Sequence, residues 1–306
     1  MEDYPKTLLE FEDRFATEEA CLEYLRKLRW PEGFQCPRCE NDRGWLTKRN
    51  LYHCGQCGLQ TSILAGTIFQ DTKKPLRLWF RAMWHVTSQK YGANALGLQR
   101  VLGLGSYRTA WVWQHKLRRA MVRPGRDRLS GVIEVDETYI GGEKPGKRGR
   151  GAAGKALVLI AAQEDKNRIG RIRLRRVLDA SADSLIPAIW EAVKPGSTLR
   201  TDGWPSYGGL PRLGYQHQVV RQSAEMGENL LPLAHQVAGL LKRWLLGTYH
   251  GAVRDYHLDY YLDEYTLSFN RRTSRSRGKL FYRLAQQAMA IDPVPGKDIR
   301  HRRSNS

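Results

Sequence analysis

The sequence predicts an α/β protein in which a mixed β-sheet is covered by helices, with a small cysteine module and a helical region in front of it. Segments 131–142, 155–165 and 170–180 are rich in Val and Ile and are joined by turn residues, which indicates three consecutive strands. Helical and strand patterns alternate after them, as in sheets flanked by helices. Four of the five cysteines fall within the 22 residues from Cys36 to Cys57.

Length and charge limit the classes of protein to consider. The 306 residues correspond to about two domains, and 50 Lys+Arg against 31 Asp+Glu give a net charge of +19. Such a surplus attracts polyanions, so nucleic acid is the expected partner. No segment approaches the ~20 apolar residues of a membrane-spanning helix, and the acidic first 30 residues are unlike a signal peptide. We expect a cytoplasmic protein.

The chain divides into five expected regions. An amphipathic helix at 17–29 carries Cys21 on its apolar face, where it is expected to be a core residue. Beyond the three strands we expect helix 183–193, strands 198–202 and 215–221, and helices 231–246, 257–268 and 277–291. The regions are an N-terminal helical segment (1–33), the cysteine module (34–62), a helical region (74–124), the sheet domain (130–291) and a basic, disordered tail (292–306).

The cysteine module has the spacing of a zinc ribbon. Cys36 and Cys39 form one CxxC pair, and Cys54 and Cys57 form a second after 14 intervening residues. Two such turns supply four thiolates to one tetrahedral Zn²⁺ and leave no position for water, so the ion is expected to be structural. The alternatives are a redox-active dithiol pair and a coincidence of spacing.

The helical region can be drawn as a helix-turn-helix. A helix over 94–102, a turn at 103–105 and a helix that begins after the N-cap Ser106 would form it. An ordinary basic connector with Trp111 and Trp113 in the core fits the same pattern. In the DNA-binding interpretation the outward side chains near the start of the second helix are Tyr107, Arg108, Trp111 and Gln114, and those that reach phosphates are Lys116, Arg118 and Arg119.

Acidic residues gather at two places in the sheet domain. In the strand GVIEVDETYIGG, alternation places Glu134, Asp136 and Thr138 on one face, and the local negative charge calls for solvent, a cation or a metal. Asp202 follows the next predicted strand. An Asp-Gly pair is typical of a turn, but an acidic residue at the carboxyl end of a strand is also where α/β sites collect ligands.

One later helix carries two further candidates. In LPLAHQVAGLLKRWLLGTYHG, His235 and Lys242 are seven residues apart and share a helix face. A metal ligand and a phosphate-binding cation on one face suit a DNA-cleaving site, whereas a solvated basic face with an incidental histidine is the alternative.

Taken in order, these motifs resemble a known family. The sequence CxxC…CxxC, VDETYIGG, TDGWPSY, LKRWLLGTYHG and YLDEYTLSFNRR is similar to the ISXO2-like transposases of the IS1595 family of bacterial insertion sequences, from about residue 20 to residue 285. The resemblance implies a DDE-type, ribonuclease-H-like catalytic domain. It implies Asp136 and Asp202 as the first two acidic residues, His235 at the third position and Lys242 as the basic residue that follows. Glu264 is the nearest alternative carboxylate for the third position.

The implied activity is a DDE-type DNA transposase, which cleaves and transfers DNA strands with Mg²⁺ or Mn²⁺ bound mainly by Asp136 and Asp202. The implied partners are the terminal inverted repeats of the element, the target DNA and further copies of the chain, near the nucleoid. Arg243 and the basic loop 141–154 are expected to follow the DNA backbone. The basic residues expected to do so in that loop are Lys144, Lys147, Arg148 and Arg150.

Three other interpretations remain open from the residues. One is a DNA-binding regulator whose second half is an inert dimerisation domain. Another is a transposase scaffold that binds element ends but no longer cuts, for which His235 is the main argument. The third is a zinc-ribbon nuclease that processes RNA.

Overall fold

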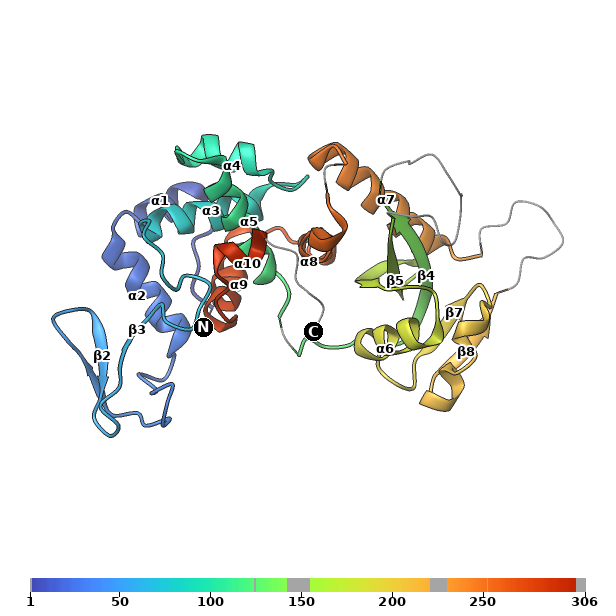
Figure 1. Ribbon diagram of the computed structural model, residues 1–306, viewed down its shortest axis with the longest axis horizontal. Coiled ribbons are helices and arrows are strands. Elements are labelled where there is room, and N and C mark those ends of the chain that lie inside the picture. The colour runs from blue at the N-terminus through green and yellow to red at the C-terminus, as the bar shows by residue number, and fades with distance from the viewer. Residues whose placement is uncertain (1, 124, 142–154, 221–229, 252, 301–306) are drawn as a thin grey trace. The chain divides into compact units, whose positions relative to one another are not determined.

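The computed structural model describes residues 2–123, 125–141, 155–220, 230–251 and 253–300 (Figure 1). The chain forms two compact units, of which unit 1 comprises Met1–Arg123 with Ser274–Ser306, and unit 2 comprises Pro124–Thr273. Unit 1 therefore contains both ends of the chain, and unit 2 is inserted between them.

Unit 1 combines helices with a small three-stranded sheet. Its helices are α1 (Leu8–Arg14), α2 (Glu18–Arg29), α3 (Leu76–Ser88), α4 (Ala95–Leu102), α5 (Tyr107–Arg119), α9 (Arg277–Ala290) and α10 (Gly296–Arg300). Several of these helices have an N-cap side chain of a favoured type. The Thr17 hydroxyl caps α2 by accepting a hydrogen bond from the Ala20 amide. The Asn94 side chain caps α4 by accepting a hydrogen bond from the Gly97 amide. Helix α4 ends at Gly103, whose positive φ of 62° suits glycine.

Aromatic side chains form the core of unit 1. The Phe281 ring of α9 lies 5.2 Å from the Phe11 ring and 5.6 Å from the Phe80 ring, both measured between centroids. Helix α9 therefore packs with the N-terminal helices, and this corrects the expected sheet domain of 130–291, which included it. Periodicity predicts the apolar face of such a helix but not which distant helix covers it.

The tail also differs from the expectation. Helix α10 lies within the segment expected to be disordered, and its Ile299 is 1% exposed. The Gly296 backbone approaches Val112 of α5. Burial of one isoleucine orders this stretch despite its basic, proline-bearing composition.

Unit 2 is built on a five-stranded mixed sheet in the order β6-β5-β4-β7-β8. Strands β4, β5 and β6 are antiparallel neighbours, whereas β7 is parallel to both β4 and β8. The strands are β4 (Val132–Ile140), β5 (Ala156–Asp165), β6 (Arg168–Val177), β7 (Thr198–Thr201) and β8 (Gln216–Val219). The helices are α6 (Ala182–Ala192), α7 (Pro232–Tyr249) and α8 (Leu258–Asn270), with single 3-10 turns η1 (Pro205–Tyr207), η2 (Leu210–Leu213) and η3 (Asp255–His257).

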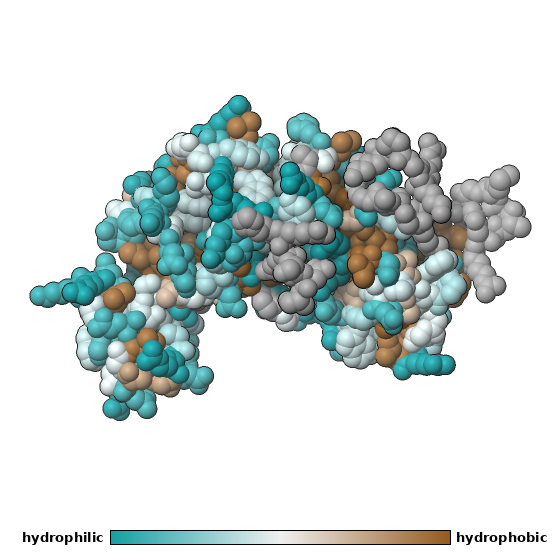
Figure 2. Space-filling view, in the orientation of Figure 1, coloured by the Kyte–Doolittle hydropathy of each residue, from teal (hydrophilic) through white to brown (hydrophobic). Residues whose placement is uncertain are grey.

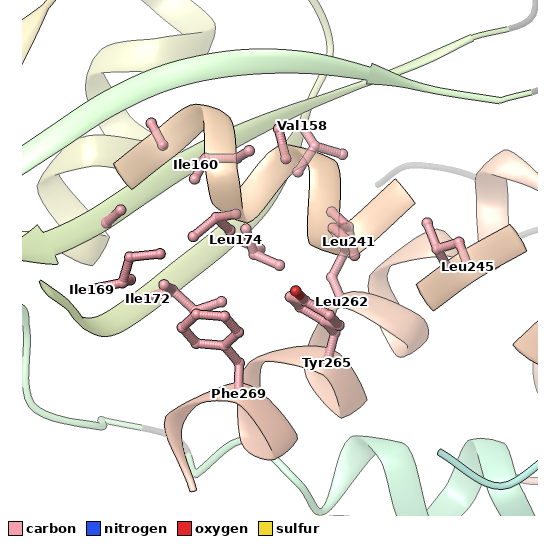
Figure 3. Close-up of a cluster of buried hydrophobic side chains, with 14 of the residues drawn as sticks. Val158, Ile160, Ile169, Ile172, Leu174, Leu241, Leu245, Leu262, Tyr265 and Phe269 are labelled. Atoms are coloured by element: carbon pink, nitrogen blue, oxygen red, sulfur yellow. The ribbon is translucent and has the colours of Figure 1, made fainter. Parts of the chain in front are cut away.

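Helices cover both faces of this sheet. On one face, Val158 and Ile160 of β5 and Leu174 of β6 pack against side chains from α7 and α8, including Leu241 and Leu262 (Figure 3). On the other face, Ile133, Val135 and Leu199 pack against α6 and the 3-10 turns. The side chains of alternate β4 residues therefore enter two separate cores.

The surface agrees with the charge of the chain. Hydrophilic residues predominate on the face shown in Figure 2, with smaller hydrophobic patches between them. Among the described residues, no helix has the length and apolar content required to span a bilayer.

Candidate functional site

The four cysteines of the CxxC pairs come together in unit 1. Their sulfur atoms all lie within 4.8 Å of one another, with 3.6 Å between Cys36 Sγ and Cys57 Sγ and 3.6 Å between Cys39 Sγ and Cys54 Sγ. A tetrahedral Zn²⁺ with Zn–S bonds of about 2.3 Å separates its sulfurs by about 3.8 Å. The cluster therefore has the size and ligand set of a structural zinc site.

Both knuckles of this cluster have the same backbone form. The amide of Glu40 donates to the Cys36 carbonyl at 2.9 Å, and the amide of Gly58 donates to the Cys54 carbonyl at 3.1 Å. Glu40 (φ 59°) and Gly58 (φ 68°) both adopt the left-handed conformation. The strands β1 (Gly44–Leu46), β2 (Leu51–Cys54) and β3 (Gln60–Ser62) form an antiparallel sheet that carries the second knuckle.

In unit 2, Asp136 lies on the face of β4 that α7 covers. Its cross-strand partner Ile160 belongs to the core beneath α7 and α8. The Asp136 side chain is 16% exposed, and its Oδ2 lies 3.2 Å from Nε2 of His235, whose own side chain is 51% exposed. The structure thus brings together Asp136, which is predicted as the first acidic residue, and His235, which is predicted at the third position.

A second carboxylate of β4 explains how α7 reaches Asp136. Glu134 is 3% exposed, and its Oε2 accepts hydrogen bonds from the amides of Leu233 (2.7 Å) and Ala234 (2.9 Å). Helix α7 begins at Pro232 and its N-cap Leu231 offers no capping side chain, so Glu134 satisfies amides that the helix leaves free. Burial raises the pKa of Glu134, and the two amide hydrogen bonds oppose that shift.

Asp202 directly follows β7, the parallel neighbour of β4. The parallel register pairs Glu134 with Arg200, and two further residues along each strand lead to Asp136 and Asp202. The exposed Asp202 side chain accepts a hydrogen bond from the Trp204 amide at 2.9 Å, which forms the turn that the Asp-Gly pair predicts. Asp202 therefore both forms a turn and lies at the carboxyl end of a strand, so the two interpretations of this residue are compatible.

The loop after Asp202 is held firmly. Trp204 Nε1 (3.0 Å) and Ser206 Oγ (2.7 Å) both donate to the Ala180 carbonyl. Gly203 has a φ of 82°, and a Cβ there would lie 2.5 Å from Val219. This loop leads into η1 and its fully buried Tyr207.

The pKa of the Tyr207 hydroxyl is shifted by its surroundings. Burial raises the pKa of its hydroxyl, and the negative charges of Glu137, Asp136 and Asp202 raise it further. The tyrosine therefore lies within electrostatic range of acidic groups from both β4 and the loop after β7.

The predicted ligands Asp136, Asp202 and His235 do not form one compact ligand set. Within the described residues, the four cysteines are the only group of three or more His, Cys, Asp or Glu side chains whose ligand atoms all lie within 4.8 Å. Glu264, the alternative carboxylate, is 2% exposed, and its Oε2 accepts from the Tyr249 hydroxyl at 3.0 Å. This hydrogen bond connects the end of α7 with α8.

Comparison with known proteins matches two parts of the chain to domains found in transposases. Residues 128–270 match the ISXO2-like transposase domain, and residues 16–60 match the transposase zinc-ribbon domain. The chain contains an ISXO2-like transposase domain preceded by a transposase zinc-ribbon domain. It is also similar to a protein of Halobacterium salinarum described as an uncharacterized protein in transposable element ISH50. The two are 25% identical over 288 residues, which cover 87% of this chain and 94% of that relative.

The expected DNA-facing residues of this transposase-family chain fall into different environments. Arg108 of α5 and Arg243 of α7 are exposed, and Arg119 is half-buried. Lys242 is exposed on α7 and lies about 10 Å along the helix axis from His235. The residues Lys144, Lys147, Arg148 and Arg150 lie outside the described residues.

Two predicted phosphate contacts are corrected. Arg118 is 1% exposed, and its guanidinium contacts the ring of His115 and the Gln114 side chain. Gln114 is also buried and donates to the Ala93 carbonyl at 2.6 Å, so it does not face outward. Lys116 donates to the Ile68 carbonyl at 3.3 Å, and burial lowers its pKa. These side chains hold unit 1 together instead of facing solvent.

Sequence reasoning named Glu134 as part of an acidic strand face but missed its hydrogen bonds to the start of α7, and it did not single out Tyr207. A signal existed for Glu134, because a helix that begins Leu231-Pro232 lacks its own N-cap and needs an acceptor from elsewhere. For Tyr207 the only signal was its place in the TDGWPSY block, which does not reveal the charges that surround it.

Proposed function

We propose that this chain is an active transposase that binds the ends of its element, cleaves a DNA strand there and joins it to target DNA. The observation that carries the proposal is the contact between Asp136 of β4 and His235 of α7, and the position of Asp202 directly after β7, the parallel neighbour of β4, supports it. The strand order, with three antiparallel strands followed by two parallel ones, supports a ribonuclease-H-like arrangement.

The donor set fits a divalent cation by its chemistry. Carboxylate oxygens are the ligands that Mg²⁺ and Mn²⁺ prefer, and Asp136 and Asp202 are the carboxylates that would hold the ions. Such ions would supply Lewis-acid stabilisation of the charge that develops on the phosphate oxygens. The cysteine cluster has a different part in this proposal. Its four thiolates leave no coordination position free for water or substrate, so its ion is structural.

The residues of the chain have separate parts in the reaction. His235 contacts Asp136 directly and orients that carboxylate, and Glu134 fixes the start of α7 so that His235 stays in place. Lys242 on the same face of α7 binds a backbone phosphate near the bond to be cut.

The bond changes are those of two successive phosphoryl transfers. In the first, water attacks the phosphorus at the element end, the bond to the 3′ oxygen breaks, and that oxygen leaves as a 3′ hydroxyl. In the second, this hydroxyl attacks a target phosphodiester, so one phosphodiester bond forms as another breaks and no external energy source is required. Two element ends require two such sites, which favours an assembly of at least two copies on DNA.

A strand-cleavage assay tests this function. Labelled duplex carrying the terminal inverted repeat of the element would be incubated with Mg²⁺ or Mn²⁺ and wild type, Asp136→Asn, Asp202→Asn or His235→Ala. We expect nicking by wild type, loss in both aspartate variants and a partial loss in His235→Ala. Asp165→Asn is the control, because Asp165 is an exposed acidic residue at the end of β5 in the same unit.

The second candidate is a protein that binds element ends without cutting them. Two features favour this candidate. The predicted third position is a histidine, and among the described residues Asp136, Asp202 and His235 do not all bring their ligand atoms within 4.8 Å of one another. Tight binding of the ends without nicking in either metal would support this candidate and contradict the proposed activity.

A further inference from the structure

Two glycines of α7, Gly239 and Gly247, have no explanation within the described residues, and Gly239 is the one on the helix face that carries His235. Gly239 lies in the interior of an 18-residue helix, where glycine is the least favourable residue after proline. Its backbone does not have a positive φ. Among the described residues, no atom beyond its own helix backbone and its chain neighbours lies within 4 Å of the point where a Cβ would be. Within the part of the chain that the structure describes, neither conformation nor packing therefore requires glycine at this position.

The surroundings of Gly239 indicate what could require it. Steps of four, three and four residues place His235, Gly239, Lys242 and Leu246 along one face of α7. All four are exposed, Leu246 to 66%. At one end of this face His235 contacts Asp136, and toward the other Lys242 presents a cation.

The length of this face matches a short piece of one DNA strand. His235 and Lys242 are separated by about 10.5 Å along the helix axis, a distance that a few nucleotides of one strand span. A strand whose reacting phosphate lies at Asp136 and whose flanking phosphate meets Lys242 must run along this face of the helix between them. Gly239 lies between these two points, where a missing Cβ lets a backbone approach the helix closely.

We infer that Gly239 is the point at which the sugar–phosphate backbone of the DNA strand passes closest to α7. This inference rests on the proposed function, because it takes the Asp136 end of the helix as the place where the strand reacts. It adds a positioning residue, and it assigns the exposed face of α7 from His235 to Lys242 to one DNA strand on its way out of the site.

The same helix supplies a matched control. Gly247 is also exposed, and a Cβ there would likewise meet nothing among the described residues within 4 Å. It lies twelve residues from His235, which turns it about 120° around the helix and off the shared face. Substitutions at the two glycines therefore change helix propensity in the same direction but differ in their position relative to the strand.

The test compares Gly239→Ala and Gly239→Leu with Gly247→Ala and Gly247→Leu. Thermal unfolding should show a Tm that rises by about 2–4 °C for Gly239→Ala, because helix propensity improves. Nicking of terminal-repeat duplex should nevertheless fall about tenfold in Gly239→Ala and about a hundredfold in Gly239→Leu, as expected when a strand is displaced by about an ångström. Both Gly247 variants should nick within about twofold of wild type.

The outcomes separate this inference from the proposed function. If wild type nicks and the Gly239 variants nick as well as the Gly247 variants, only the inference is wrong. A lower Tm for Gly239→Ala would show that the chain itself fills the space, and would also overturn it. If wild type binds the duplex in Ca²⁺ but never nicks, the proposed activity fails, and weaker binding by Gly239→Leu than by Gly247→Leu still decides the inference. Absence of both binding and nicking in wild type overturns both.

Discussion

Replacement of Glu134 by Ala removes the carboxylate that caps α7 across the sheet. Two amide hydrogen bonds, of 2.7 and 2.9 Å, are lost at a site that is 3% exposed. Hydrogen bonds to a charged acceptor contribute about 1.5–3 kcal/mol each, and the cost of burying the carboxylate offsets part of this. We therefore expect Glu134→Ala to lower the free energy of unfolding by about 3 kcal/mol.

The same change should reduce catalysis beyond its effect on stability. Without the cap, the first turn of α7 is no longer tied to β4, and His235 loses its position 3.2 Å from Asp136. Nicking should fall about a hundredfold at temperatures where the variant is still folded, because small displacements of catalytic groups have large effects. Glu134→Gln keeps an oxygen that can accept from both amides, so we expect it to lie within about 1 kcal/mol of wild type.

The assay is urea unfolding followed by circular dichroism, with nicking rates measured at low temperature on the same preparations. Glu164→Gln is the control, because it removes a half-exposed carboxylate from an ion pair with Arg200 on the same sheet. Such pairs contribute at most about 1 kcal/mol. The reasoning is refuted if Glu134→Ala unfolds and nicks like the Glu164→Gln control.

Further predictions concern three other places in the fold. Gly278→Ala should destabilise unit 1 by about 1–3 kcal/mol in the same urea assay, because a Cβ there would lie 1.5 Å from the Pro5 carbonyl oxygen. Burial lowers the pKa of His217 below its ordinary value of 6.5, so its contribution to stability is full above about pH 6.5 and is lost as the pH falls through the folded-state pKa. His217→Gln should therefore flatten the decline of Tm between about pH 7 and pH 5; an unchanged slope would contradict this. Cys54→Ser should reduce bound zinc, measured by atomic absorption, from one equivalent to a small fraction and should loosen the ribbon, whereas Cys21→Ser should retain the metal.

The elements of the fold were largely predictable because their signals are local. The Val- and Ile-rich strands of the sheet and the apolar periodicity of α7 and α8 place each element within a few residues of its observed bounds. The CxxC pairs likewise predicted the cysteine cluster, since a knuckle turn fixes two thiolates over four residues.

What could not be predicted depends on contacts between distant segments. Arg118 reads as an exposed cation in the sequence, yet it is buried against His115 because α5 turns that face inward. Helix α9 packs in unit 1 because Phe281 belongs to its aromatic core, and no local sequence pattern predicts that contact. The cap of α7 joins Glu134 to amides about 100 residues later, and the packing of α7 on the sheet brings them together.

The central claim is that Asp136 and Asp202 hold divalent ions against the bond that is cut, and a metal-rescue measurement tests it most directly. A terminal-repeat duplex with sulfur in place of the 3′ oxygen at the cleavage position would be offered to wild type in Mg²⁺ and in Mn²⁺, which accepts sulfur ligands more readily. We predict slow cleavage in Mg²⁺, restored in Mn²⁺ for wild type and not for Asp202→Asn. Equal cleavage of the sulfur and oxygen substrates in Mg²⁺ would contradict a metal contact with the leaving atom.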